Sequence, residues 1–317
     1  MIKELKFVQG AISRKDLVPA MKHFAIEGGR VRSYNGILAI SSPIAFNIDC
    51  YPRADTLIKA IGNCEDTVTL ALTPTGKLSV KSGQFKALIQ CVEKSEVHLE
   101  PTGTITQCDG EALLKAFKVL ESFVGEDASR PWANGILLRG ASAFATCNVV
   151  LCEYWTGITF PHVVNIPHAA VKEVIRVGEA PSHLQMDDKS ITFHYTDGRW
   201  IRTQLFETDW PDLGKVLDRA CNATDVDTRI FESLDKLKPF VDKSGRIIYT
   251  AGKVSTHEDD EEGGHVEIPN STMLGVYALD MILLLKGVAK QADFTTYPNP
   301  CLFYGDNIRG AIVGRKI

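Results

Sequence analysis

The sequence predicts an α+β fold of three repeated domains, each with two helices and two runs of antiparallel strands. Two observations lead to this prediction. The segment that begins at Leu5 aligns without gaps with the segment that begins at Phe117, an offset of 112 positions, and a unit of one short helix and two alternating strands recurs three times. Similarity at a fixed spacing is typical of repeated structural units. The 317 residues, 44% of them hydrophobic, suffice for two or three modest cores rather than one.

The first half of the repeat reads as a helix, a proline-containing loop, a strand, a turn and a strand. The offset places Pro19 over Pro131 and the small residues Gly28-Gly29 over Gly140-Ala141. Apolar stretches lead into both turns, as expected for hairpins. In the third repeat the corresponding helix is predicted over residues 228–241.

The second half of the repeat begins with a short helical pattern, at residues 56–61, 170–175 and 280–286. Each pattern is followed by strands with period-two alternation. In the second copy these strands flank the Asp197-Gly198 turn. Alternation around such a turn predicts an antiparallel hairpin.

Short polar stretches separate the repeats. Boundaries are predicted near residues 101–103 and 221–223, because such stretches are typical of connections between domains. The resulting domains are 1–104, 105–215 and 216–317.

A strand-like lead, Thr104 to Cys108, precedes the first helix of the second domain. The corresponding lead of the first domain would precede Met1. We therefore expect domain 1 to lack its first strand, unless the start of the chain lies further upstream.

Composition excludes several classes of protein. Lys and Arg number 35 against 39 Asp and Glu, so the formal charge of −4 excludes binding of nucleic acid through a polybasic tail. No apolar run reaches the roughly 18 residues of a membrane span, and the N-terminus lacks the apolar core of a secretory signal. The eight cysteines are scattered without a Cys-x-x-Cys pair, which favours free thiols and a cytoplasmic protein.

Basic side chains recur on the predicted helices, often three or four positions apart on one helix face. Such pairs are most often solvated, but their recurrence in the same element of every repeat favours a surface that contacts phosphates without reading bases. These residues are Lys3, Lys6, Lys59, Lys115, Lys118, Lys172, Arg176, Lys236, Lys286 and Lys290.

Charge differs between the first and the last domain. Domain 1 has 13 Lys and Arg against 10 Asp and Glu, and domain 3 has 12 against 15. These opposite excesses favour head-to-tail association of domain 1 with domain 3 of a second copy. The acidic run 258–262 is predicted as a solvated hairpin loop, with a divalent-cation site as the alternative.

Four motifs carry a resemblance to a known family. They are residues 126–138 (EDASRPWANGILL), similar to an E-x-x-R-x-x-L-N-G-hydrophobic run, and residues 76–83 (GKLSVKSG), 164–171 (VNIPHAAV) and 206–213 (FETDWPDL). In this order and spacing they resemble the bacterial sliding clamp, the β subunit of DNA polymerase III, over essentially the whole chain. The departures from the family's patterns fit a phage-encoded or mobile-element member.

The resemblance implies an architecture and a function. Each domain would place two helices on one side of curved antiparallel sheets, and three domains would form half of a six-domain ring. A head-to-tail homodimer would encircle double-stranded DNA without reading its sequence, with the helices facing the hole. It would act as a processivity factor that holds a DNA polymerase and meets a clamp loader through short peptide motifs.

The resemblance also implies a peptide-binding cleft between the second and third domains. The family's T-D-G-H-R-L segment reads TCNVVL at residues 146–151, and the chain ends in IVGRKI at residues 312–317 instead of methionine-proline-methionine-arginine. We therefore expect an altered cleft. Its expected lining is Ala133, Thr146, Asn148, Leu151, Ile312, Val313, Gly314 and Lys316.

Further residues are carried over from the family. Lys15, Arg130 and Trp132 lie in loops expected to face DNA, with a buried anchor as the alternative for Trp132. The joint between two chains is expected at Ala87, Ile89, Phe240 and Val241.

Two other functions stay open. A clamp-fold scaffold that does not encircle DNA would lack salt-sensitive DNA association. A metal-dependent hydrolase could use His162, His168, Asp187 and Asp188, but these residues lack the H-E-x-x-H spacing that places metal ligands on one face. No phosphate-binding or nucleophile motif is present, so we predict no enzyme, no cofactor and no bound metal.

Overall fold

A computed structural model gives the fold and describes residues 1–13, 18–65, 67–94, 100–206, 210–259 and 261–316. The chain divides into two compact units. Unit 1 contains residues 1–117 and 166–206, and unit 2 contains residues 118–165 and 207–317. Both units combine helices with antiparallel sheets, which confirms the α+β class. None of the described helices is long and apolar enough to cross a membrane.

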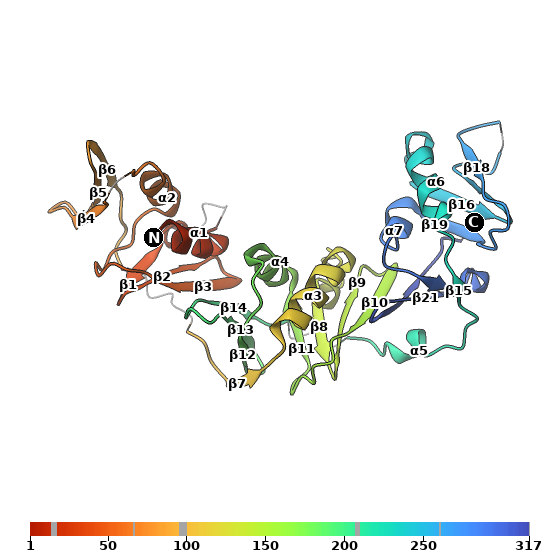
Figure 1. Cartoon of the computed structure of the whole chain (residues 1–317), viewed down its shortest axis with the longest axis horizontal. Coiled ribbons are helices and arrows are strands. Elements are labelled where there is room, and N and C mark those ends of the chain that lie inside the picture. The colour runs from red at the N-terminus through yellow and green to blue at the C-terminus, as the bar shows by residue number, and fades with distance from the viewer. Residues whose placement is uncertain (14–17, 66, 95–99, 207–209, 260, 317) are drawn as a thin grey trace. The chain divides into compact units, whose positions relative to one another are not determined.

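Unit 1 is built on a seven-stranded antiparallel sheet in the order β1-β2-β3-β14-β13-β12-β7. Figure 1 shows the early strands in red beside the later strands in green, so segments far apart in the sequence share one sheet. The strands are β1 (Ala25–Glu27), β2 (Arg30–Tyr34), β3 (Leu38–Pro43), β7 (Thr104–Gln107), β12 (His183–Met186), β13 (Ser190–His194) and β14 (Trp200–Gln204).

Amphipathic helices complete the core of unit 1. In the first helix Leu5 and Val8 are fully buried while Lys3 and Lys6 are exposed, so one face packs and the other meets solvent. Edge-to-face ring pairs such as Phe117 and Phe193, 6.0 Å apart, fill the interior. The helices are α1 (Ile2–Val8), α2 (Ala54–Gly62), α4 (His168–Val177) and the first part of α3 (Gly110–Leu120).

A separate three-stranded antiparallel sheet, in the order β4-β5-β6, also belongs to unit 1. Its strands are β4 (Thr69–Leu72), β5 (Leu78–Ser82) and β6 (Phe85–Ile89). β6 is therefore an edge strand, and along it Leu88 is exposed while Ile89 is fully buried.

Unit 2 contains an eight-stranded sheet in the order β11-β8-β9-β10-β22-β21-β20-β15 and a four-stranded sheet in the order β18-β17-β16-β19. The strands of the first sheet are β8 (Gly135–Arg139), β9 (Ser142–Thr146), β10 (Val150–Trp155), β11 (Val164–Pro167), β15 (Thr224–Asp225), β20 (Gln291–Ala292), β21 (Cys301–Gly305) and β22 (Ile308–Ile312). Those of the second are β16 (Arg246–Thr250), β17 (Lys253–Ser255), β18 (His265–Glu267) and β19 (Gly275–Ala278).

The helices of unit 2 are shorter than their sequence patterns predicted. The pattern over residues 228–241 forms α6 (Arg229–Leu237) followed by the 3-10 helix η5 (Lys238–Phe240). The pattern over residues 280–286 forms α7 (Leu279–Leu283), which ends before Lys286. A third helix, α5 (Gly214–Leu217), was not predicted.

The sequence repeat is visible in the secondary structure. β2 and β9, β3 and β10, and the 3-10 helices η1 (Gln9–Ala11) and η3 (Glu121–Phe123) begin 112 positions apart. Each large sheet joins the first half of one repeat to the second half of the next, with Ser41 opposite Trp200 in unit 1 and Val150 opposite Ile312 in unit 2. The three domain boundaries stay a prediction, and the compact units cut across them.

Candidate partner-binding cleft and nucleic-acid surface

A pocket of ≈ 300 Å³ opens on the surface of unit 2. One wall comes from the 3-10 helix η4 (Pro131–Ala133) and the residue before it, through Trp132 and Arg130. A second wall comes from the turn between β9 and β10 and the start of β10, including Leu151. The segment from Pro211 to Val216 and the end of β22 close the pocket.

A hydrophobic cluster underlies this pocket. Its buried members include Leu137, Phe144 and Leu302, and Leu151 packs against them from the pocket side. The alternation of β8, β9 and β10 places Leu137, Phe144 and Leu151 on one face of the sheet. The pocket therefore has an apolar base suited to apolar side chains.

Polar groups at the rim are held by a local network. Arg130 donates from Nη1 to Asn148 Oδ1 at 2.9 Å, and the Asn148 backbone N–H donates to Thr146 Oγ1 at 3.0 Å. Asn148 has a φ of 69°, the left-handed conformation that asparagine tolerates. Hydrogen bonds from Ser129 lower the pKa of Asp127, so this carboxylate stays ionised beside Arg130. The rim thus presents an oriented guanidinium.

Two tryptophans stiffen the wall. The rings of Trp132 and Trp210 meet edge to face with centroids 5.2 Å apart. The carbonyl of Trp132 accepts a hydrogen bond from Asn165 Nδ2 at 2.9 Å. Trp132 is half-buried and lines the pocket. It is therefore partly the buried anchor and partly the exposed ring that the sequence left as alternatives.

Half of the predicted cleft residues line this pocket, namely Thr146, Asn148, Leu151 and Val313. The prediction that Ala133 and Ile312 line the cleft is wrong, because both side chains are fully buried in the core. Their neighbours Trp132, Ala311 and Val313 line the pocket instead. Gly314 and Lys316 are not among its lining residues.

Arg130 and Trp132 were expected to face DNA, and the structure places both in the pocket wall. Leu213, Val216 and Pro300 also line the pocket, although they were not predicted. The signal available for one of them, Leu213, was the motif at residues 206–213, which marked the segment without showing which way its side chains point.

The predicted basic surface is exposed. Lys15 lies outside the described residues. The predicted lysines that the structure describes are all exposed, namely Lys3, Lys6, Lys59, Lys115, Lys118, Lys172, Lys236, Lys286 and Lys290. Lys286 and Lys290 lie beyond α7 rather than on it, and they pair with Asp235 at 3.0 Å and with Asp306 at 2.6 Å.

Arg176 is held in place by hydrogen bonds to two partners. Its Nε donates to Glu173 Oε2 at 2.9 Å, and its Nη2 donates to the Phe7 carbonyl at 2.9 Å. Glu173 is 6% exposed and lies against Gly10, where an added β-carbon would be 1.7 Å from its Oε1. Hydrogen bonding to Glu173 raises the pKa of Arg176, so the guanidinium is a fixed charge on this surface.

The hydrolase alternative gains no support from Asp187. Its Oδ1 accepts backbone N–H groups of Lys189 and Ser190 at 2.9 and 2.7 Å, and its Oδ2 accepts from Thr102 at 2.7 Å. Burial would raise the pKa of Asp187, but these hydrogen bonds lower it to about 2. Within the described part of the chain, no group of three His, Cys, Asp or Glu side chains is placed to hold a metal.

The sequence matches no protein-family profile and no curated protein sequence. Solved structures match over 100% of this chain and 97% of theirs. They include the sliding clamp (DNA polymerase III subunit beta) of Bartonella birtlesii bound to griselimycin (TM-score 0.84, 15% identity), the beta subunit of Pseudomonas aeruginosa (0.83, 15%) and the clamp of Bacillus subtilis (0.85, 12%). The fold is that of a bacterial sliding clamp.

Within this clamp fold, the predicted joint residues differ in exposure. Phe240 is 54% exposed, and Ala87 and Val241 are half-buried. The side chain of Ile89 is fully buried within unit 1, so only its backbone on the edge strand β6 is placed for a contact with a second copy. Its neighbour Leu88, on the opposite side of β6, is 51% exposed.

Proposed function

We propose that the protein is a DNA sliding clamp: a head-to-tail homodimer that encircles double-stranded DNA and holds a replicative polymerase and a clamp loader through the cleft of unit 2. It acts without catalysis and without a cofactor, in the cytoplasm. A phage origin remains a prediction from the sequence.

The observation that carries this proposal is an incomplete sheet at each end of the repeat series. In unit 2 the four strands β11-β8-β9-β10 continue into β22-β21-β20. The four-stranded sheet β19-β16-β17-β18 repeats the order of β11-β8-β9-β10. The three-stranded sheet, read as β6-β5-β4, repeats the order of β22-β21-β20. Exposed sheet edges favour pairing with another chain. Pairing β18 of one copy with β6 of another would repeat a joint that occurs twice within the chain, in the β3–β14 pair and in the β10–β22 pair.

The two internal joints also fix the expected register. Tyr154 lies opposite Ile308 in the β10–β22 pair. When the β16–β17 turn is superposed on the β8–β9 turn, Val266 corresponds to Tyr154. Phe85 is the first residue of β6 and corresponds to Ile308, the first residue of β22. Val266 of one copy is therefore expected opposite Phe85 of the other.

Charge supports the same joint. Lys81 and Lys86 are exposed on β5 and β6, whereas Glu267 is exposed on β18 and the described residues of the loop 258–262 are exposed acids. Opposite potentials favour a head-to-tail encounter and disfavour pairing of like ends. Two such joints close a ring by two-fold symmetry.

The exposed lysines and Arg176 support sequence-independent contact with DNA. Contacts of this kind act through counterion release and carry no base readout. In a chain of net charge −4 they would hold DNA weakly, and closure of the ring would supply the retention. The apolar base of the cleft supports binding of a short peptide with apolar side chains.

The test is topological retention. A Phe85→Cys and Val266→Cys double variant is assembled on nicked circular plasmid, oxidised and passed through a gel-filtration column. Cross-linked rings should stay with circular DNA at high salt and leave when the plasmid is cut. A dimer that cross-links but never stays with the circle would contradict the clamp and favour the scaffold, and absence of the cross-link would contradict the joint.

Reversing the charge of basic residues tests the proposed DNA-facing lining independently of ring closure. A fourfold variant at the proposed lining should lose low-salt retention of the uncrosslinked ring, while the matched control at exposed basic residues elsewhere should keep it. The lining variant carries Lys115→Glu, Lys118→Glu, Lys172→Glu and Arg176→Glu. The control carries Lys189→Glu, Lys215→Glu, Arg219→Glu and Lys243→Glu. Equal retention by both variants would refute the lining assignment.

A further inference from the structure

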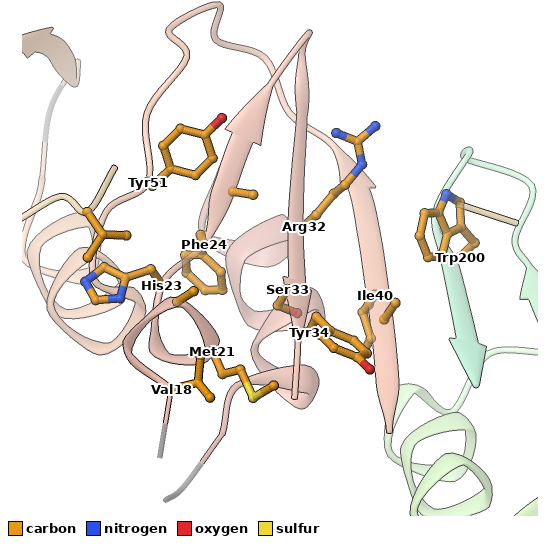
Figure 2. Close-up of a pocket in the computed structure, with 14 residues that line it drawn as sticks. Val18, Met21, His23, Phe24, Arg32, Ser33, Tyr34, Ile40, Tyr51 and Trp200 are labelled. Atoms are coloured by element: carbon orange, nitrogen blue, oxygen red, sulfur yellow. The ribbon is translucent and has the colours of Figure 1, made fainter. Parts of the chain in front are cut away.

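A second cavity, of ≈ 50 Å³, lies in unit 1 and belongs to none of the sites described above. Its walls are mostly apolar and aromatic, with Phe24, Tyr51, Val92 and Trp200 among them. Figure 2 shows the Phe24 and Tyr51 rings on one side of the strand that carries Arg32 and the Trp200 ring on the other, and the Arg32 guanidinium lies between Tyr51 and Trp200 in this view. Such a cavity suits one apolar group next to a cation.

Arg32 has an unused hydrogen-bond donor. Its side chain is 19% exposed, and its Nη2 pairs with Glu100 Oε1 at 3.0 Å. Its Nε is buried and has no hydrogen-bond partner among the residues that the structure describes. A buried donor without an acceptor is costly, so an incoming oxygen acceptor would be stabilised there.

The surroundings of Arg32 are cationic. Arg202 is 9% exposed, and its Nε and Nη1 also lack hydrogen-bond partners within the described ranges. Arg202 lies opposite Ala39 in the β3–β14 pair, and Ala39 lines the cavity. The nearby Glu27 is already engaged by Tyr51 and by Lys94. The charge here is complementary to an added anion.

The internal repeat relates this cavity to the cleft of unit 2. Four of its lining positions correspond under the 112-residue offset to four lining positions of the cleft. Val18, Ala20, Tyr34 and Ala39 correspond in this order to Arg130, Trp132, Thr146 and Leu151. The two hollows thus occupy equivalent places in two copies of one structural unit.

We propose that the cavity of unit 1 is a second peptide site, which takes a small branched apolar side chain with an adjacent carboxylate on Arg32. The peptide class rests on the proposed function of the cleft, whereas the anionic requirement rests on Arg32 and Arg202 alone. The cleft offers no equivalent of Arg32, since Phe144 occupies the corresponding position. The two sites therefore select different peptides.

The probe is acetyl-Gly-Val-Asp-Gly-amide with 4,4,4-trifluorovaline at the Val position, followed by the ¹⁹F line width during titration with the full-length chain. The matched peptide has Asn in place of Asp, which keeps the shape and removes the charge. Loss of a charge-assisted hydrogen bond should weaken binding roughly 10-fold, both for the Asn peptide and for an Arg32→Gln variant.

Two further variants separate the sites. Ala39→Leu fills the cavity with the residue that position 151 carries, and it should abolish binding. Arg130→Gln alters only the cleft, and it should leave binding of the Asp peptide unchanged. The proposal is overturned by no binding to the wild type, by equal binding of the Asp and Asn peptides, or by loss in Arg130→Gln alone. That last result would still support peptide binding by the cleft, so the two proposals fail separately. Thermal unfolding checks each variant, and Arg32→Gln carries the test if Ala39→Leu does not fold.

Discussion

The joint between two copies can be tested by removing two exposed apolar side chains, Leu88 on β6 and Phe240 after α6. The register inferred for the joint places Leu88 opposite Gly263 of the other copy. The next residue, Gly264, lies against Phe240, where an added β-carbon would be 3.2 Å from the ring. The two side chains are thus expected to meet across the joint. The variant carries Leu88→Asn and Phe240→Ser.

The expected magnitude follows from exposure. Leu88 and Phe240 expose 51% and 54% of their surface in the single chain. Full burial of such a side chain contributes about 1.5–3 kcal/mol, so burial of the remaining half contributes about 1 kcal/mol. A ring has two joints and each would lose both side chains, which gives about 4 kcal/mol and a roughly 1000-fold weaker dimer.

Light scattering during size exclusion, over a dilution series, measures this change. The wild type should show a mass near twice 34.9 kDa to much lower concentration than the variant. Leu72→Asn is the matched control, because Leu72 is 47% exposed on β4, the opposite edge of the same sheet. The reasoning is refuted if the double variant dimerises as the wild type does, or if Leu72→Asn weakens the dimer equally.

Three further predictions concern the interior of unit 1. Gly10→Ala should lower the free energy of unfolding by about 2 kcal/mol, because its β-carbon would displace the buried Glu173 carboxylate; urea unfolding measures this, and adding Glu173→Ala should restore part of the loss. Burial, with His183 and Arg30 nearby, lowers the pKa of His194 to about 4, so the unfolded chain binds the proton first and stability falls as pH drops from 6.5 towards 4. The melting temperature of His194→Asn should fall less than that of the wild type over this range, and parallel curves would contradict the assignment. Asp187 has a folded pKa of about 2, below its usual 3.8, so its contribution is present above pH 3.8 and is lost as pH falls towards 2. Asp187→Asn should therefore melt lower than the wild type at pH 7 and converge with it near pH 2.

The repeat was predictable from the sequence because it needs no gap. Helix, proline loop and hairpin keep their lengths between the first two copies, so one alignment of Pro19 with Pro131 places η2 (Pro19–Lys22) over η4. The exposed lysines were predictable for the same reason, since amphipathic spacing alone decides which helix face meets solvent. Lys286 and Lys290 were assigned to a helix that ends at Leu283, because helix ends depend on packing beyond the local pattern.

The direction in which individual side chains point at the predicted sites could not be decided from the sequence. Ala133 and Ile312 were each placed at a surface where an adjacent residue lies. In a strand, neighbouring side chains point to opposite faces, so a motif that is correct in position still errs by one residue in exposure. Ala133 errs for a related reason, because the 3-10 helix turns Trp132 outward and Ala133 inward. Burial, which depends on the whole unit, resolves these cases.

The pairing of strands across repeats was likewise beyond local patterns. Ser41 and Trp200 are far apart in the sequence, and nothing near either residue specifies the other. Once this joint is known, however, it constrains the rest of the molecule. The same joint recurs at Val150 and Ile312, so it is a property of the repeat rather than of one pair of strands. A series of three repeats has two internal joints and leaves one half-joint at each end, and a second copy is the simplest partner that carries both complements.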